Sequence, residues 1–228
     1  MAFLLHIESS STVCSVSLAQ KNQLIACSEL DNGYSHAENL HVFINNLLKD
    51  NQIQPSQLSA IVISAGPGSY TGLRIGFSAA KGLAYALQIP LITLDTLQIL
   101  TQAVIKDVPD DALLCPMMDA RRMEVYLALY NSQLNTLIST KPFIVTNESV
   151  KELAQFNKDI YFFGSGMLKS KPLLNECLNR SFFIEQVNTS SRYLIELGYE
   201  KYVMKDFVDV AYSEPNYLKD FFFTSSKN

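Results

Sequence analysis

Apolar and polar residues follow one another in blocks along the chain, and the blocks predict a regular order of strands and helices. The first half holds three strands, a helix, a strand, a longer helix, a strand and a final helix. They are predicted at 3–7, 12–19, 24–31, 36–49, 60–65, 71–87, 91–94 and from residue 95 onward. Ser35 is placed to cap the helix over 36–49, and Leu40, Ile44, Leu47 and Leu48 form its apolar stripe.

The second half repeats this order of elements. They are predicted at 112–118, 124–130, 137–146, 148–156, 160–163, 168–179, 182–184 and 191–206. Two passes through the same order predict a duplicated α/β unit, with an N-terminal lobe over 1–98 and a C-terminal lobe over 99–228. No low-complexity linker separates the halves, so we expect a shared interface and a terminal segment that packs back on the first lobe.

Composition and charge narrow the class of protein. The 228 residues are 48% apolar, which excludes a disordered or fibrous chain. The 18 Lys and Arg against 22 Asp and Glu leave a net charge of -4, so the chain has no general attraction for nucleic acid. The four cysteines lack the spacing of a zinc clip, and the first residues lack the pattern of a signal peptide or membrane span. We expect a cytoplasmic protein without a membrane segment.

A glycine-rich turn over residues 66–72 lies between a buried strand and the long helix. Free N–H groups in such a turn can bind an anion, but the sequence has neither the Lys-Ser/Thr pair of a P-loop nor the third glycine of the dinucleotide motif. A tight structural turn with Ser69 or Thr71 as helix cap is an equal alternative.

Small residues recur every three or four positions along one stripe of the long helix: Gly72, Gly76, Ala79, Gly82 and Ala86. A bulkier stripe of Leu73, Phe77, Ala80, Ala84 and Leu87 is expected to face the sheet. The helix therefore buries two sides. The second side faces either the helix over 36–49 of the same chain or another molecule, and the pattern alone leaves both open.

Catalytic and metal-binding patterns are weak. His36 and His41 diverge on a helix, and His6 has no acidic or cysteine neighbour, so we expect no metal site. The sequence offers no Ser-His-Asp arrangement. Asp119, Arg121 and Glu124 form a charged cluster in a strand-turn-strand setting, which is either a site or a solvated turn. We therefore expect no catalytic, cofactor-binding or metal-binding residue.

The segment Gly-Pro-Gly-Ser-Tyr-Thr-Gly-Leu-Arg-Ile-Gly at 66–76 resembles the signature of the bacterial TsaB (YeaZ) family. Further segments that resemble the family are Ile7-Glu8-Ser9-Ser10, Cys14-Ser15-Val16, Ser35-His36-Ala37-Glu38, residues 119–126 and Pro215-Asn216-Tyr217-Leu218-Lys219. The family usually has Asp in place of Glu8 and commonly Arg in place of Lys219, which argues against an intact phosphate loop at the first turn.

The resemblance implies an α/β fold of the duplicated actin-like or sugar-kinase-like (ASKHA) type, with two lobes that each hold a mixed sheet flanked by helices. It also implies a noncatalytic partner subunit of the TsaD threonylcarbamoyl transferase, which forms N6-threonylcarbamoyladenosine at position 37 of tRNA. The expected partners are TsaD and TsaE, a second copy of the chain when TsaD is absent, and tRNA only through the complex. The His-x-x-x-His metal pair of active relatives is missing from residues 92–99.

The resemblance also implies that the first two helices form the partner interface. The residues expected there are His36, Glu38, Leu40, Phe43, Gly72, Ile75, Gly76, Ala79, Gly82, Leu83 and Ala86. The competing hypothesis is an enzyme of the same fold, either an ATP-dependent kinase or a metallohydrolase. For a kinase, Glu8 and Asp119 are the acids that could be nominated.

Overall fold

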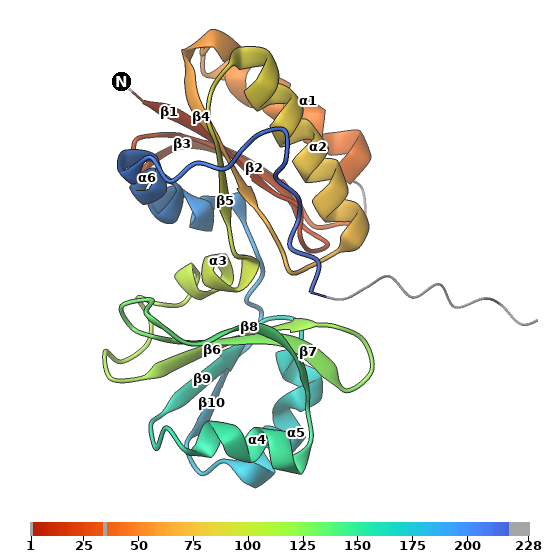
Figure 1. Ribbon diagram of the computed structural model, residues 1–228, viewed down its shortest axis with the longest axis vertical. Helices are drawn as coiled ribbons and strands as arrows, with labels where there is room; N and C mark the ends of the chain where they lie inside the picture. Colours follow the sequence, from red (N-terminus) through yellow and green to blue (C-terminus); the bar gives the residue numbers. More distant parts are fainter. Residues whose placement is uncertain (1, 34–35, 219–228) are drawn as a thin grey trace, which may run out of the picture.

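The computed structural model describes residues 2–33 and 36–218, which form two lobes stacked along the long axis of the molecule (Figure 1). The elements of the first lobe in chain order are β1 (Phe3–Glu8), β2 (Cys14–Gln20), β3 (Gln23–Leu30), α1 (His36–Asp50), β4 (Leu58–Ser64), α2 (Tyr70–Leu87) and β5 (Leu91–Leu94). Helix α3 (Thr96–Gln102) lies between the lobes. Ser35, the predicted cap of α1, lies outside the described residues.

The second lobe repeats the first. Its elements are β6 (Leu113–Asp119), β7 (Glu124–Asn131), β8 (Thr136–Ile144), α4 (Asn147–Ala154), β9 (Ile160–Phe163), α5 (Met167–Cys177) and β10 (Ser181–Ile184). The strand orders β3-β2-β1-β4-β5 and β8-β7-β6-β9-β10 match position by position. In both sheets the first three strands are antiparallel and the last two run parallel to the first. The predicted duplication and fold class are confirmed.

Each lobe has its last helix packed against the sheet of the other lobe. Helix α3 follows the first lobe in sequence, yet Leu97 and Leu100 join a core with Leu114 and Phe163 of the second sheet. After β10 the chain forms a 3-10 turn (Ser191–Leu194) and α6 (Ile195–Met204). Leu194 and Leu197 of this region pack against Leu4, Ala60, Val62 and Ile92 of the first sheet. This exchange holds the lobes together, because separating them would expose apolar surface on both sheets.

The division of the chain at residues 98 and 99 stays a prediction. That boundary falls inside α3, whose Leu97 and Leu100 lie on the second sheet while Ile99 packs with residues of the first. Helix α6, predicted to run to residue 206, ends earlier, because Lys205 adopts a left-handed conformation with φ 57°.

The residues after α6 form an extended segment, which we call the tail (206–218), along the first lobe (Figure 1). Val208 N donates to Leu91 O at 3.0 Å, and Asn216 N donates to Ala65 O at 2.6 Å. Between these points Lys81 Nζ of α2 donates to the carbonyls of Ala211 and Ser213 at 3.0 and 2.8 Å. The tail is thus fixed at both ends and in the middle.

Within the described ranges, no helix is both long and apolar enough to cross a membrane.

Replacement of Leu194 by Ala tests the exchange of helices between lobes. Leu194 is 0% exposed, so we expect Leu194→Ala to lower the free energy of unfolding by about 2–5 kcal/mol. Urea unfolding measures the change. The control is Val203→Ala on α6, where the side chain is 61% exposed and a change within about 0.5 kcal/mol is expected. Equal effects of the two substitutions would contradict the packing described for this region.

Candidate partner-docking surface

Helices α1 and α2 lie side by side on one face of the first sheet (Figure 1). Ser69 caps α2, because its Oγ accepts a hydrogen bond from Gly72 N at 3.2 Å. The inner faces are those that the sequence predicts. Buried positions include Leu40, Ile44, Leu47 and Leu48 on α1, and Leu73, Phe77, Ala80 and Ala84 on α2.

The small-residue stripe of α2 is divided into two parts with different surroundings. A Cβ atom at Gly72 would overlap the carbonyl oxygen of Ser9, and one at Gly76 would overlap the Ser9 hydroxyl. These two glycines therefore let α2 lie directly on the turn that follows β1. The expectation that they face a second chain is corrected: in this fold their Cα atoms are covered by the chain itself.

Three more of the residues expected at the interface are covered by their own chain. Ala79 and Leu40 belong to the core between α1, α2 and the sheet. His36 is buried, and its Nε2 forms a 2.9 Å hydrogen bond with Ser11 O. His36 thus fixes the start of α1 to the first turn, while His41 is exposed. For Ala79 the structure favours the alternative in which the second neighbour of α2 is α1 of the same chain.

The remaining six residues of the predicted interface are accessible. Glu38, Gly82 and Ala86 are exposed, and no atom lies within 4 Å of a Cβ built at Gly82. Phe43, Ile75 and Leu83 are half-buried at the edge of the core. We call this set the docking seam: Glu38, Phe43, Ile75, Gly82, Leu83 and Ala86.

The sequence prediction missed two exposed apolar side chains on the same helices. Val42 on α1 is 50% exposed and Tyr85 on α2 is 80% exposed. The sequence could have indicated them, because each is a large apolar or aromatic residue on the side of its helix that otherwise carries polar or small residues. Aromatic side chains such as that of Tyr85 are enriched at protein interfaces relative to the rest of the surface.

The first turn contains a buried acid. The carboxyl of Glu8 is fully buried, and its Oε1 accepts hydrogen bonds from the backbone N and the hydroxyl of Ser10, both at 2.6 Å. Burial raises the pKa of this carboxyl, and the hydrogen bonds from Ser10 oppose the rise. Because Glu8 is 0% exposed, a substrate could reach its carboxyl only if the surrounding turn moved.

The glycine-rich turn closes over the first turn. Ser69 N donates to Ser10 O at 2.6 Å, and a Cβ atom at Gly68 would overlap that same oxygen. The N–H groups of Ser69 and Gly72 are therefore satisfied inside the chain. Of the two interpretations of this turn, the structure favours the structural one, in which the glycines allow two backbone turns to touch.

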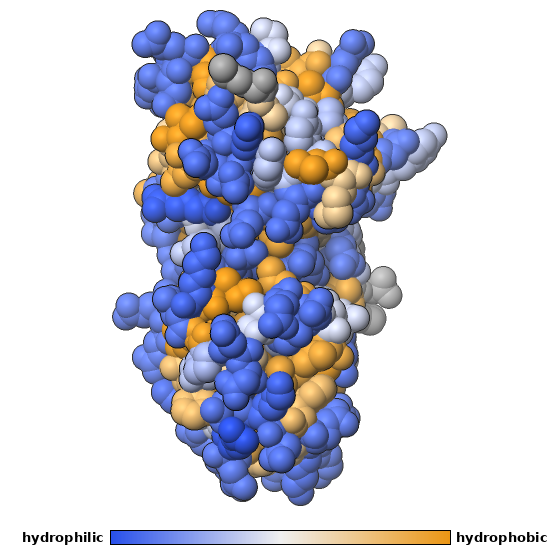
Figure 2. All heavy atoms as spheres, turned by 90° about the vertical axis from the view of Figure 1, so that its left-hand side faces the viewer, coloured by the Kyte–Doolittle hydropathy of each residue, from blue (hydrophilic) through white to orange (hydrophobic). Residues whose placement is uncertain are grey.

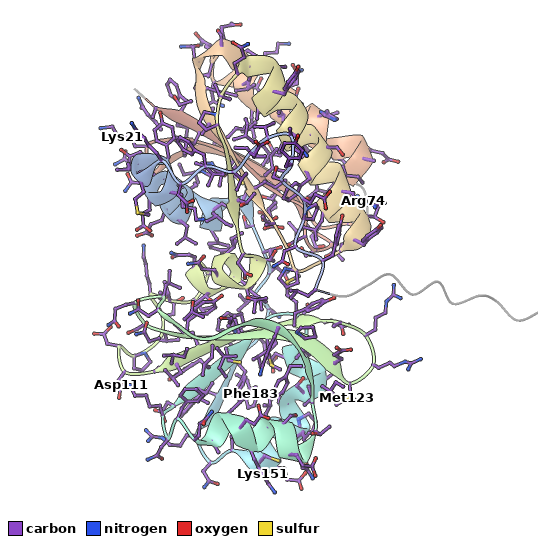
Figure 3. The ribbon with its side chains drawn as sticks, viewed as in Figure 1. Lys21, Arg74, Asp111, Met123, Lys151 and Phe183 are labelled. Carbon is purple, nitrogen blue, oxygen red and sulfur yellow. The ribbon has the colours of Figure 1, made fainter. Side chains whose placement is uncertain are left out.

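The charged cluster after β6 is a turn held by a lysine from α5. Arg121 N donates to Asp119 Oδ1 at 2.9 Å, and Lys169 Nζ pairs with the Asp119 carboxylate. The same Nζ donates to the carbonyls of Arg122 and Glu124 at 2.7 and 2.6 Å. Figure 3 labels Met123 in this turn. Within the ranges 2–33 and 36–218, no group of three His, Cys, Asp or Glu side chains could hold a metal ion.

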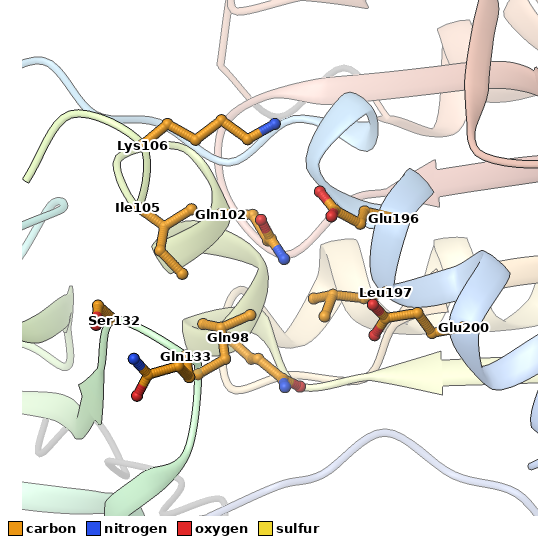
Figure 4. Close-up of a pocket in the computed structure, with 10 residues that line it drawn as sticks. Gln98, Gln102, Ile105, Lys106, Ser132, Gln133, Glu196, Leu197 and Glu200 are labelled. Carbon is orange, nitrogen blue, oxygen red and sulfur yellow. The ribbon is translucent and has the colours of Figure 1, made fainter. Parts of the chain in front are cut away.

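An open hollow of about 380 Å³ lies between α3, α6 and the turn after β7 (Figure 4). Its charged residues, Lys106, Glu196 and Glu200, are all exposed. Figure 2 shows this side of the molecule, where hydrophilic side chains surround small apolar patches. None of the residues that line the hollow was predicted as a site, and their solvation makes it a polar groove rather than an enclosed pocket.

Comparison with known proteins places the chain in a family. A family model described as "TsaD: tRNA N6-adenosine threonylcarbamoyltransferase" matches residues 32–221. The Bacillus subtilis protein named tRNA threonylcarbamoyladenosine biosynthesis protein TsaB is 30% identical over 221 residues, which cover 95% of this chain and 93% of that protein. The chain belongs to the TsaB (YeaZ) family. A TsaB of Haemophilus influenzae is 25% identical, again over 95% of this chain and 93% of that protein.

Solved structures of TsaB relatives have the same fold. The structure titled "YeaZ from Pseudomonas aeruginosa" superposes with a TM-score of 0.78 at 22% identity, covering 96% of this chain and all of that one. A ROK family protein from Streptococcus pneumoniae matches with a TM-score of 0.50 at 11% identity, covering 89% and 99% of the two chains. At these identities the matches show the fold alone.

Two glycines on the TsaB signature helix are expected to respond in opposite ways to alanine. Gly72→Ala forces a methyl group onto the backbone of Ser9, so we expect it to lower the free energy of unfolding by about 1–3 kcal/mol. Gly82→Ala meets no atom and improves helix propensity, so we expect a gain of about 0.5–1 kcal/mol. Urea unfolding of both variants measures the pair. A gain at Gly72 would contradict the contact between α2 and the first turn.

The buried Glu8 carboxyl predicts a pH dependence of stability. Its folded pKa is raised, so the unfolded chain releases this proton at a lower pH, and stability falls as pH rises above the ordinary value of about 4.5. Glu8→Gln removes this loss. We expect the variant to gain on the natural chain as pH rises, by up to about 1.4 kcal/mol per pH unit in the titrating range.

Denaturant unfolding at several pH values measures this difference. Glu38→Gln, at an exposed acid on α1, is the control and should show little pH-dependent difference. If the difference between Glu8→Gln and the natural chain stayed constant with pH, Glu8 would not titrate as its burial requires.

Proposed function

We propose that the chain is the noncatalytic partner subunit of a TsaD-family threonylcarbamoyl transferase, in the pathway that forms N6-threonylcarbamoyladenosine at position 37 of tRNA. The observation that carries this proposal is the 30% identity, over 95% of the chain, to a protein named for that biosynthesis. The signature at residues 66–76 lies inside the match to the TsaD model. A TsaE-family ATPase completes the proposed set of partners, and the proposed location is the cytoplasm.

The proposed mode of action is docking through the seam between α1 and α2. Three features support this surface. Phe43, Ile75 and Leu83 are half-buried at the edge of the core, Val42 and Tyr85 are exposed, and Gly82 leaves room for a helix to approach. Helix axes can come within about 8 Å where the residues in contact are small. When the TsaD-family partner is absent, the same seam is proposed to pair with a second copy of this chain.

Two observations favour docking over catalysis by this chain. A kinase reaction would need an acid that can accept a proton from a hydroxyl, and two open turns for the phosphates. Glu8 is fully buried, so a substrate hydroxyl cannot reach its carboxyl in this structure, and Ser10 of its turn is in contact with the glycine-rich turn. The net charge of -4 also supports tRNA contact through the complex rather than through this subunit alone.

Gly82→Glu tests the docking seam. The substitution places a bulky charge where the proposed helix contact is closest, so we expect the affinity for the TsaD-family protein of the same genome to fall at least about 10-fold. Calorimetry measures the affinity, and mass spectrometry of tRNA modified by the reconstituted subunits measures the yield of threonylcarbamoyladenosine. Val203→Glu, at an exposed position on α6, is the matched control.

Circular dichroism of each variant alone separates loss of docking from loss of folding. Full binding and full modification with Gly82→Glu would remove the seam as the docking surface. Threonylcarbamoyl transfer by the isolated chain would overturn its proposed noncatalytic role.

A further inference from the structure

Arg74 stands on the outer side of α2, near its N-terminal end (Figure 3). Its side chain is exposed, and its Cζ lies 4.2 Å from the centre of the Tyr70 ring. Among residues 2–33 and 36–218, no Asp or Glu forms an ion pair with Arg74. Arginine is one of the residue types enriched at the positions that contribute most to binding at protein interfaces.

Stacking on Tyr70 orders the guanidinium without using its hydrogen-bond donors. A guanidinium that lies over an aromatic ring is held through its face, while its N–H groups point outward from the edge. Those N–H groups have the spacing to bind both oxygens of a carboxylate. The entropy cost of ordering this long side chain is therefore met before a partner arrives.

The tail holds the ring on which Arg74 stacks. Tyr217 contacts Tyr70 with ring centres 5.0 Å apart. The neighbouring Asn216 is fixed by the 2.6 Å hydrogen bond from its N to Ala65 O. Two segments that are far apart in the sequence, around residues 70 and 217, thus meet at the start of α2. Tyr217 is 37% exposed, so the cluster of Arg74, Tyr70 and Tyr217 lies at the surface.

The charges of the two helices indicate what Arg74 binds. Lys81, the other cation of α2, donates to two tail carbonyls and is engaged inside the chain. The cation of α1 is Lys49, in its last turn and far along the helix from the N-terminal end. Arg74 is therefore the cation of α2 that stays available, and a carboxylate is the group that complements it.

We propose that Arg74 recognises a carboxylate side chain on the TsaD-family partner, and that Tyr70 and Tyr217 are its positioning residues. This inference rests on the proposed docking function. It adds a charged contact at the N-terminal end of α2, beyond the apolar and small residues of the seam.

Substitutions of Arg74 test the charged contact by calorimetry with the TsaD-family protein of the same genome. We expect Arg74→Gln to weaken binding at least about 30-fold, because removing one residue of an interfacial charge pair leaves the other charge without its partner. Arg74→Lys keeps the charge but loses the planar guanidinium that can bind both carboxylate oxygens. Its affinity should therefore lie between those of the natural chain and Arg74→Gln. The affinity of the natural chain should also decrease more between low and high salt than that of Arg74→Gln.

The positioning role of the tyrosines is tested with conservative pairs. Tyr70→Phe and Tyr217→Phe keep the rings, so both should bind within about 3-fold of the natural chain. Tyr70→Leu and Tyr217→Ala remove a ring and should weaken binding by about 10-fold while the salt dependence moves toward that of Arg74→Gln. Equal affinity of the Phe and non-aromatic variants would overturn the positioning role.

A charge swap identifies the source of the carboxylate. Arg74→Glu should bind poorly, and one Asp→Lys or Glu→Lys substitution on the partner should restore its binding. Asp220 of this chain lies outside the described residues, so Asp220→Asn is tested beside it. A loss with Asp220→Asn equal to that with Arg74→Gln would overturn the assignment to the partner. The assignment to the partner would also be overturned if Arg74→Gln lost self-association, measured by sedimentation, but kept its affinity for the partner.

The two proposals fail in different ways. If Arg74→Gln binds like the natural chain while Gly82→Glu does not bind, the docking seam stands and the role of Arg74 is overturned. If both variants bind like the natural chain, the proposed docking function is overturned together with the inference that rests on it.

Discussion

The contact between the first turn and the start of α2 is the constraint on which the rest of the structure depends. Backbone atoms of Ser9 and Ser10 lie so close to Gly68 and Gly72 that no side chain fits between them. Only glycine permits this approach, since any Cβ would overlap a carbonyl oxygen. The contact fixes α2 on the sheet, and the hydrogen bond from His36 to Ser11 brings the start of α1 to the same turn.

The two sides of the layer formed by α1 and α2 differ in which groups are left available for binding. On the inner side, Glu8 is enclosed with a raised pKa, and the amides of Ser69 and Gly72 in the glycine-rich turn donate to acceptors within the chain. Packing of the two turns therefore occupies the space around Gly68 and Gly72 and uses the N–H groups of Ser69 and Gly72. On the outer side, Gly82, Ala86 and the exposed Val42 and Tyr85 remain available. The physical arrangement agrees with a subunit that works through its surface.

The lobes are joined by helices that cross between them and by a tail that returns to the first lobe. Helix α3 follows the strands of the first lobe in sequence but lies on the second sheet. Helix α6 follows the strands of the second lobe but lies on the first sheet. The tail runs from β5 along α2 toward the N-terminal end of that helix, where the ring of Tyr217 contacts the ring of Tyr70. A docking surface built from α1 and α2 therefore depends on residues from both ends of the chain.

The sequence by itself determined the elements, the duplication and the inner faces of α1 and α2, because hydrophobic periodicity is a local property of each segment. The small-residue stripe showed the limit of that information. Periodicity marked Gly72 and Gly82 as equivalent, but one faces the backbone of Ser9 and the other faces solvent. Only the tertiary structure decided this difference, as it decided that Lys169 holds the turn after Asp119 and that Tyr217 supports Tyr70. These contacts join residues far apart in the chain, and the pattern of a single segment contains no record of which distant segment will cover it.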